Sequence, residues 1–183
     1  MRAGIVLVIG GFHGTGKSTC AKMLANELKL RYISAGEIFR AMAREKGMDV
    51  EQFSRYAEKH HEVDREVDSR VIDASKEGNA VIEGQISAGL VEKPDITVFL
   101  TAPEDIRIER LSHRDGKSTE KSSRETKTRE ASEKRRYMKA YGIDVYDYSA
   151  YNLIIDTSKW SADSITKIIK TAAEEFLKEK LKT

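Results

Sequence analysis

One stretch of the chain constrains its fold more than any other: the eight residues Gly11–Ser18, with the sequence GFHGTGKS. An apolar run, Ile5–Ile9, precedes it, and apolar residues at helical spacing follow it. A strand, a glycine-rich loop and a helix in this order, with the pattern G-x-x-x-x-G-K-[ST], predict a phosphate-binding loop (P-loop). Its glycines let backbone N–H groups turn toward phosphate oxygens, and the positive end of the helix adds attraction. The sequence therefore predicts that the chain binds a nucleoside triphosphate.

The side chains of this loop and of a second strand end have expected roles. Lys17 is expected to reach the β- and γ-phosphates, and the Ser18 hydroxyl to ligate Mg²⁺. Glu83 follows the apolar residues 80–82, where a P-loop protein commonly has a carboxylate that assists the metal. A helix-capping or loop carboxylate is the alternative. The residues expected to hold the triphosphate are Gly11, Phe12, His13, Gly14, Thr15, Gly16, Lys17, Ser18 and Thr19.

Length and composition limit the class of protein. A chain of 183 residues predicts one domain, and a charged fraction of 34% with no apolar run of membrane-spanning length predicts no membrane partner. The N-terminal apolar run lacks the form of a signal peptide, and a single cysteine, Cys20, excludes an internal disulfide. We therefore expect a cytoplasmic protein, with Cys20 as a packing residue of the first helix. We also expect a monomer.

Positive charge is concentrated in residues 114–139, which hold ten Lys or Arg against five Asp or Glu. Such a segment can close over polyphosphate, and a solvated helix face is the alternative. Nucleic acid is a poor candidate partner, because no aromatic residue interrupts this segment before Tyr137.

Short apolar runs alternate with helical patterns along the chain. We expect strands at 4–9, 32–34, 80–82, 96–100 and 152–156, and helices at 17–28, 35–44, 50–60, 61–76, 103–114 and 163–181. The polar residues 115–140 are expected to be helical and mobile. This alternation predicts a three-layer α/β/α fold with a five-stranded parallel sheet, whose ligands bind at the carboxyl ends of the strands.

Several arginines are placed to meet phosphate groups. Arg40 lies one helical turn after Gly36, on the side expected to face the P-loop, where a guanidinium could clamp a second phosphate. Solvation on the helix surface is the alternative for this arginine. Two further sets of residues each share one helix face. Arg107, Arg110 and Arg114 are spaced i, i+3, i+7, and Arg129, Glu133 and Arg136 are spaced i, i+4, i+7. They suggest a lid that brings positive charge onto a transferring phosphoryl group.

With these residues in view, the chain resembles the archaeal-type cytidylate kinases, P-loop nucleoside monophosphate kinases related to the adenylate kinases. The resemblance extends nearly from end to end. It is carried by the P-loop, Ser34–Arg40, Gly47-Met48, Val63–Asp68, Ile82–Gly84, Arg129–Tyr137, Tyr141–Asp144 and Ile155–Ser158. The stretch Arg-Glu-x-Ser-Glu-x-x-Arg-Tyr at 129–137, followed by Tyr-Gly-Ile-Asp, is the most specific part.

The resemblance implies a transferase of pyrimidine nucleotide metabolism that converts ATP and CMP or dCMP into ADP and CDP or dCDP, with Mg²⁺. It also implies acceptor-binding helices at about 35–75 and a lid at about 114–140 within a single domain, 1–183. The residues that would carry catalysis are Lys17, Arg40, Arg129 and Arg136. Arg110 and Arg114 would lie near ATP. The acceptor-binding residues would be Ser34, Gly36, Arg40, Arg70, Gln85, Arg129, Glu133 and Arg136.

One position departs from the family pattern. The family usually follows the acidic residue and glycine with arginine, which grips the acceptor phosphate, whereas this chain has Gln85. A neutral amide cannot replace a bidentate guanidinium, so the departure implies weakened activity, a changed acceptor, or a clamp supplied by a lid arginine.

Two alternative functions stay open from the sequence. The acceptor could be AMP or UMP, because base specificity depends on a few buried hydrogen bonds that a sequence does not display. The chain could also be an ATP-binding switch or assembly factor without kinase activity, because of Gln85.

Overall fold

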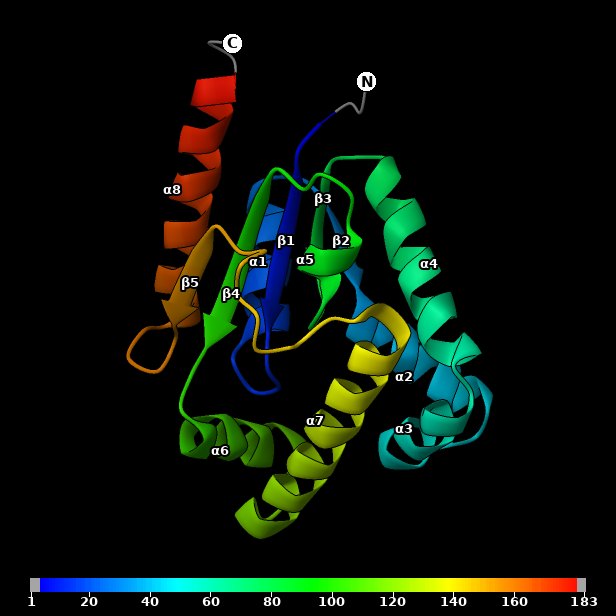
Figure 1. Cartoon of the computed structure of the whole chain (residues 1–183). Coiled ribbons are helices and arrows are strands. Elements are labelled where there is room, and N and C mark those ends of the chain that lie inside the picture. The colour runs from blue at the N-terminus through cyan, green and yellow to red at the C-terminus, as the bar shows by residue number, and fades with distance from the viewer. Residues whose placement is uncertain (1–3, 181–183) are drawn as a thin grey trace.

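A five-stranded parallel β-sheet forms the centre of the protein (Figure 1). The computed structural model describes residues 4–180 of the chain. The strands lie in the order β2-β3-β1-β4-β5, and all four neighbouring pairs are parallel. Their bounds are β1 (Val6–Gly11), β2 (Arg31–Ser34), β3 (Ala80–Glu83), β4 (Ile96–Thr101) and β5 (Leu153–Asp156). The central strand, β1, leads directly into the P-loop, so the loop lies at the point where the strand order reverses.

Helices connect the strands and cover the sheet. They are α1 (Lys17–Glu27), α2 (Ala35–Glu45), α3 (Val50–Lys59), α4 (Glu62–Lys76), α5 (Ser87–Leu90), α6 (Glu104–Asp115), α7 (Thr119–Tyr141) and α8 (Ala162–Lys180). The predicted α/β/α fold is confirmed, and the expected strands and long helices are present within a few residues of their predicted bounds. The predicted end of the last helix, Leu181, lies outside the described residues. Among residues 4–180, no helix is both long and apolar enough to span a membrane.

The two faces of the sheet bury different sets of apolar side chains. Because successive side chains of a strand point to opposite faces, Leu7 and Ile9 pack with α1 and α8, while Val6 and Val8 pack with α4 and α5. Each such fully buried aliphatic side chain contributes about 1.5–3 kcal/mol relative to exposure. The sheet is therefore held between two helical layers, with its strand ends fixed in position.

The carboxyl ends of the strands face two helical arms. Figure 1 shows α2 and α3 on one side of this end and α6 and α7 on the other. A separate apolar cluster, which includes Phe39, Phe53, Val63 and Val67, joins α2, α3 and α4 into one unit. Helix α7 contacts both α6 and α3, so it spans the space between the arms.

The cluster around Phe53 gives a stability prediction. Phe53 is 0% exposed and packs against Phe39, with 4.8 Å between ring centroids. We expect Phe53→Ala to lower the free energy of unfolding by about 3–5 kcal/mol, because it removes a buried ring and leaves a cavity. Ile168→Ala on the exposed side of α8 serves as the control and should change it by less than about 1 kcal/mol. Urea denaturation measures the free energy of unfolding of both variants. Equal losses of stability in the two would contradict the placement of Phe53 in the core.

Candidate active site

The P-loop is held in shape by bonds to its own backbone. Gly14 has φ +80°, and a Cβ there would lie 2.4 Å from the carbonyl oxygen of Arg107, so glycine is required. The Phe12 carbonyl accepts hydrogen bonds from Thr15 Oγ1 and from Lys17 Nζ, both at 2.8 Å. The Lys17 ammonium thus lies folded over the loop, where a phosphate would meet it.

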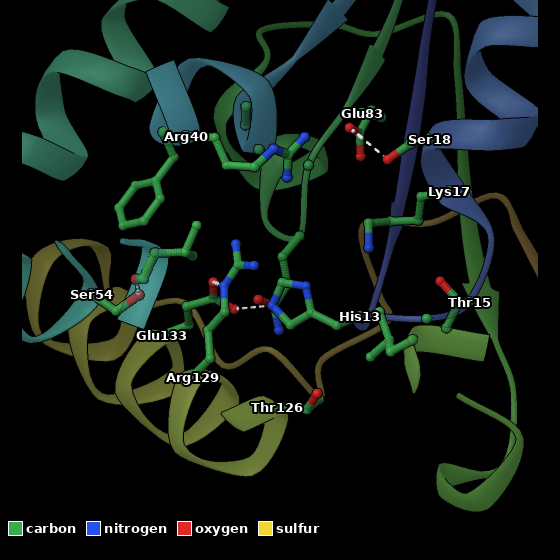
Figure 2. A pocket seen from close by; sticks show the side chains of 18 of the residues that line it. His13, Thr15, Lys17, Ser18, Arg40, Ser54, Glu83, Thr126, Arg129 and Glu133 are labelled. Atoms are coloured by element: carbon green, nitrogen blue, oxygen red, sulfur yellow. Dashed lines mark hydrogen bonds and ion pairs between the residues drawn. The ribbon is translucent and has the colours of Figure 1, made fainter. Parts of the chain in front are cut away.

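A large cavity, of about 1000 Å³, opens between the P-loop, α2, α4 and α7. Its size is at the upper end of the range for small-molecule sites. Figure 2 shows His13, Lys17, Arg40, Arg129 and Glu133 directed into this space from three different segments of the chain. The residues proposed from the sequence that line it are His13, Gly14, Thr15, Gly16, Lys17, Ser18, Thr19, Gly36, Arg40, Glu83, Gln85, Arg110, Arg114, Arg129, Glu133 and Arg136.

Three of the proposed residues lie behind the cavity wall. A Cβ on Gly11 would meet the Leu100 carbonyl oxygen at 2.2 Å, so this glycine permits close strand packing. The Phe12 ring is buried edge-on against Phe99. Ser34 caps α2 by accepting a hydrogen bond from the Glu37 N–H at 3.0 Å. These three residues shape the site from behind and do not line the cavity.

Arg70 is a proposed acceptor contact that does not line the cavity. It is half exposed on α4 and forms an ion pair with Glu66, one turn away. The inward face of α4 is formed by Asp64, Val67 and Val71, which are three, four or seven residues apart, and Arg70 lies off that stripe. The structure therefore gives no support to an acceptor contact by Arg70.

The position expected to hold Mg²⁺ is built around Glu83, at the end of β3. Its Oε1 accepts hydrogen bonds from Ser18 Oγ at 3.1 Å, from Tyr32 at 3.2 Å and from Ser34. Within the described residues, no group of three or more His, Cys, Asp or Glu could form a protein-only metal cage. A carboxylate beside a hydroxyl fits Mg²⁺ nonetheless, because in such sites Mg²⁺ takes one or two protein oxygens together with water and substrate phosphates.

Three of the cationic side chains that line the cavity, Lys17, Arg40 and Arg129, lie close enough to interact electrostatically. Burial lowers the pKa of Lys17, and the nearby carboxylates of Glu83 and Glu133 oppose that effect. Burial likewise lowers the pKa of Arg40, and the positive charge of Arg129 adds to it. Positive charge is therefore held at close quarters in a partly desolvated space, an arrangement that favours the binding of anions.

Glu133 on α7 neutralises part of this charge. Its carboxylate accepts hydrogen bonds from His13 Nε2 and from Arg129 Nε, each at 2.8 Å. Burial alone would raise the pKa of Glu133, but His13, Arg129 and Arg136 hold it well below its usual range. Burial also lowers the pKa of His13, with Arg129 acting in the same direction and Glu133 opposing both.

A second carboxylate on α7 joins that helix to the P-loop, which the sequence reasoning missed. Glu130 Oε1 accepts hydrogen bonds from the His13 backbone N–H at 3.2 Å and from Arg107 at 2.6 Å. Arg107 is buried, donates to the His13 carbonyl at 2.8 Å and lies 5.4 Å from the centre of the Phe12 ring. Arg107 therefore anchors α7, in contrast to the phosphate-facing arginines with which its spacing had grouped it.

The other two arginines of α6 line the cavity on the side of the loop after β5. Arg110 donates to the hydroxyl of Thr157 at 2.9 Å and to its carbonyl at 2.8 Å. Trp160, which is largely exposed, lies in the same wall. Arg114 pairs with the neighbouring Asp115 at 2.7 Å.

The far end of the cavity is formed by α4 and α7. Asp64 forms a buried ion pair with Arg136, and one turn further along α4 Asp68 accepts a hydrogen bond from Tyr141. Burial raises the pKa of both aspartates, that of Asp68 to about 6. The sequence reasoning assigned neither aspartate a role. The available signal was that both carboxylates lie beside the valines of one apolar helix stripe.

The raised pKa of Asp68 predicts a pH-dependent stability. The pKa of the Asp68 carboxyl is about 3.8 in the unfolded chain and about 6 in the folded chain, because burial and the charge of Asp64 raise it more than Tyr141 and Arg136 lower it. Folding is therefore disfavoured progressively as pH rises from about 4 to about 6, because the folded state must hold a buried anion. Asp68→Asn keeps an acceptor for Tyr141 and should be more stable than wild type at about pH 7.5, by at most about 3 kcal/mol. Urea denaturation at about pH 4 and 7.5 measures the free energy of unfolding of both proteins. If the difference between variant and wild type were the same at both pH values, the raised pKa of Asp68 would be contradicted.

Comparison with known proteins shows the family to which the chain belongs. Residues 6–159 match the cytidylate kinase-like family. A cytidylate kinase of Methanocaldococcus jannaschii is 43% identical over 95% of this chain and 100% of its own length, and one of Pyrococcus horikoshii is 45% identical over 94% and 90%. A solved shikimate kinase of Acinetobacter baumannii, 17% identical, superposes with a TM-score of 0.58 over 95% of this chain and 96% of its own, and so shares the fold alone. The chain belongs to the cytidylate kinase-like family.

Proposed function

We propose that this protein transfers the γ-phosphate of ATP to CMP or dCMP, which yields ADP and CDP or dCDP. Its membership of the cytidylate kinase-like family supports the acceptor. The observation that best supports this reaction is that Lys17 of the P-loop lines the same cavity as Arg40 and Arg129, which come from two other segments (Figure 2). Such a cavity can hold two phosphate groups facing each other.

The donor nucleotide would occupy the P-loop side of the cavity. Backbone amides of the loop and Lys17 would hold its phosphates, and its base would extend toward Arg110 and Trp160. Ser18 and Glu83 are the residues that would hold Mg²⁺, and the bound ion would neutralise charge on the β- and γ-phosphates. The hydrogen bonds from Tyr32 and Ser34 keep the Glu83 carboxylate oriented toward Ser18.

The acceptor phosphate would lie between Arg40 and Arg129. Glu133 accepts from Nε of Arg129, so this bond orients the guanidinium toward the space that Figure 2 shows between Arg40 and Lys17. The acceptor phosphate oxygen is itself the nucleophile, and no protein base is needed. Positioning and charge neutralisation by these cations supply the rate enhancement.

Gln85 would not take part in the phosphate clamp. Its side-chain oxygen and nitrogen are both buried and have no hydrogen-bond partner within residues 4–180. An amide donates weakly compared with a guanidinium, so Arg40 and Arg129 would supply the clamp that the family usually completes at this position.

Closure of the two arms would complete the site. In this proposal, residues of about 35–75 carry the acceptor and those of about 114–140 form the lid, as the sequence predicted. Helix α7 carries Arg129 and Glu133 and is tied to the P-loop by Glu130, so movement of this helix would change the positions of both phosphate groups together. Closure of this kind excludes water from the transferring phosphoryl group.

Product formation from several acceptors tests the function. The purified protein is incubated with ATP, Mg²⁺ and CMP, dCMP, UMP or AMP, and nucleoside diphosphates are separated by chromatography. We expect CDP and dCDP to form fastest. Lys17→Ala should lose at least about 10²-fold in rate because a charge-stabilising donor is removed, whereas Lys167→Ala on the exposed side of α8 should keep wild-type activity.

Two results would contradict this function. One is binding of ATP without a diphosphate product from any acceptor, which would favour an ATP-dependent switch. The other is full activity in Lys17→Ala, which would remove the P-loop from the reaction.

A further inference from the structure

The ion pair between Asp64 and Arg136 is buried but incompletely bonded. The two residues are 5% and 3% exposed, and Arg136 donates to Oδ1 of Asp64. Asp64 Oδ2 and Arg136 Nε are also buried, yet neither has a hydrogen-bond partner in the part of the chain that the structure describes. A buried polar atom without a hydrogen bond costs roughly 1–3 kcal/mol, and more when it belongs to a charged group. Both residues line the cavity, so a ligand there could supply the missing partners.

The pair lies beside the proposed phosphate site, separated from it by an aromatic ring. The guanidinium carbon of Arg129 is 5.9 Å from the centre of the Phe39 ring, and that of Arg136 is 5.7 Å from the same centre. Phe39 and Val67 line this part of the cavity and provide an apolar surface for a flat base. A nucleotide whose phosphate meets Arg129 would therefore bring its base toward Asp64 and Arg136.

The chemistry of the pair restricts which base it can bind. An ionised carboxylate only accepts hydrogen bonds, and a guanidinium only donates them. Cytosine presents an amino donor beside a ring-nitrogen acceptor, which matches Asp64 Oδ2 and Arg136 Nε. Uracil presents a carbonyl oxygen and a ring N–H at the same two positions, so both contacts would be mismatched.

We propose that Asp64, held by Arg136, is the residue that selects cytosine over uracil in the acceptor. The inference rests on the proposed kinase function and extends it by assigning base selection to one carboxylate. Asp68, one turn away on α4, differs because it accepts a hydrogen bond from Tyr141, which belongs to the protein itself. It therefore provides a matched control.

Exchange of the carboxylate for an amide tests this assignment. In Asp64→Asn, the amide oxygen can still accept from Arg136, and the amide NH₂ can donate to the uracil carbonyl. We expect the ratio of kcat/KM for CMP to that for UMP to fall at least about 100-fold, because the cytosine amino group loses its acceptor while one of the two uracil mismatches is removed. Asp68→Asn should leave this ratio within about 3-fold of wild type, since it makes no base contact in this assignment.

The outcomes separate the inference from the function on which it rests. An unchanged ratio in Asp64→Asn, or an equal change in Asp68→Asn, overturns the role of Asp64 while CMP turnover persists. Absence of product from every acceptor in the wild-type protein overturns the kinase function instead.

A second measurement uses the wild-type protein and does not require the variant to fold. Calorimetry compares CMP with the 5′-monophosphate of pyrimidin-2-one riboside, which lacks only the amino group. We expect the analogue to bind at least about 10-fold more weakly, because one hydrogen bond to a charged group is lost and Asp64 Oδ2 is left unpaired. Equal affinities would overturn the proposal.

Discussion

The architecture of this site depends on the balance between buried cations and the carboxylates that face them. Lys17, Arg40 and Arg129 line one cavity, where burial and repulsion from the positive charge of Arg129 lower the pKa of Lys17 and of Arg40. Glu83 and Glu133 offset that repulsion in the absence of nucleotide. In the proposed reaction, phosphate groups take over this role, so the same charges that disfavour the empty cavity strengthen ligand binding.

Helix α7 joins the parts of the site that the sheet and the other helices hold apart. Glu130 links it to the P-loop, Glu133 orients Arg129 at the centre, and Arg136 pairs with Asp64 on α4. These four residues of α7 lie within two turns, so their directions follow from helical geometry. A rigid helix with contacts in three directions can couple the donor half of the cavity to the acceptor half, provided that the arms move in the way we propose.

Local sequence patterns predicted the sheet, most of the helices and the P-loop of this structure. Side-chain contacts between residues far apart in the sequence became visible only in the structure. The alternation of apolar runs and helical patterns was sufficient to predict the parallel sheet. The sequence GFHGTGKS was sufficient to predict the P-loop. Helix α5 was missed because four residues are too few to show periodicity. Arg70 was assigned from the family resemblance alone, whereas burial decides which face of a helix turns inward, and Arg70 pairs with Glu66 outside the buried stripe of α4. The pairs Arg107–Glu130 and Asp64–Arg136 span 23 and 72 residues, and no local signal reports such contacts.

The most direct test of the central claim is calorimetric binding of a bisubstrate analogue in which adenosine and cytidine are joined by five phosphates. If both phosphate groups meet in one cavity, one analogue binds per chain, at least about 100-fold more tightly than ATP, since the second half binds intramolecularly. Arg129→Ala should remove most of that gain, whereas Arg124→Ala, an exposed position on the same helix, should not. An affinity no higher than that of ATP, or two analogues per chain, would contradict the account.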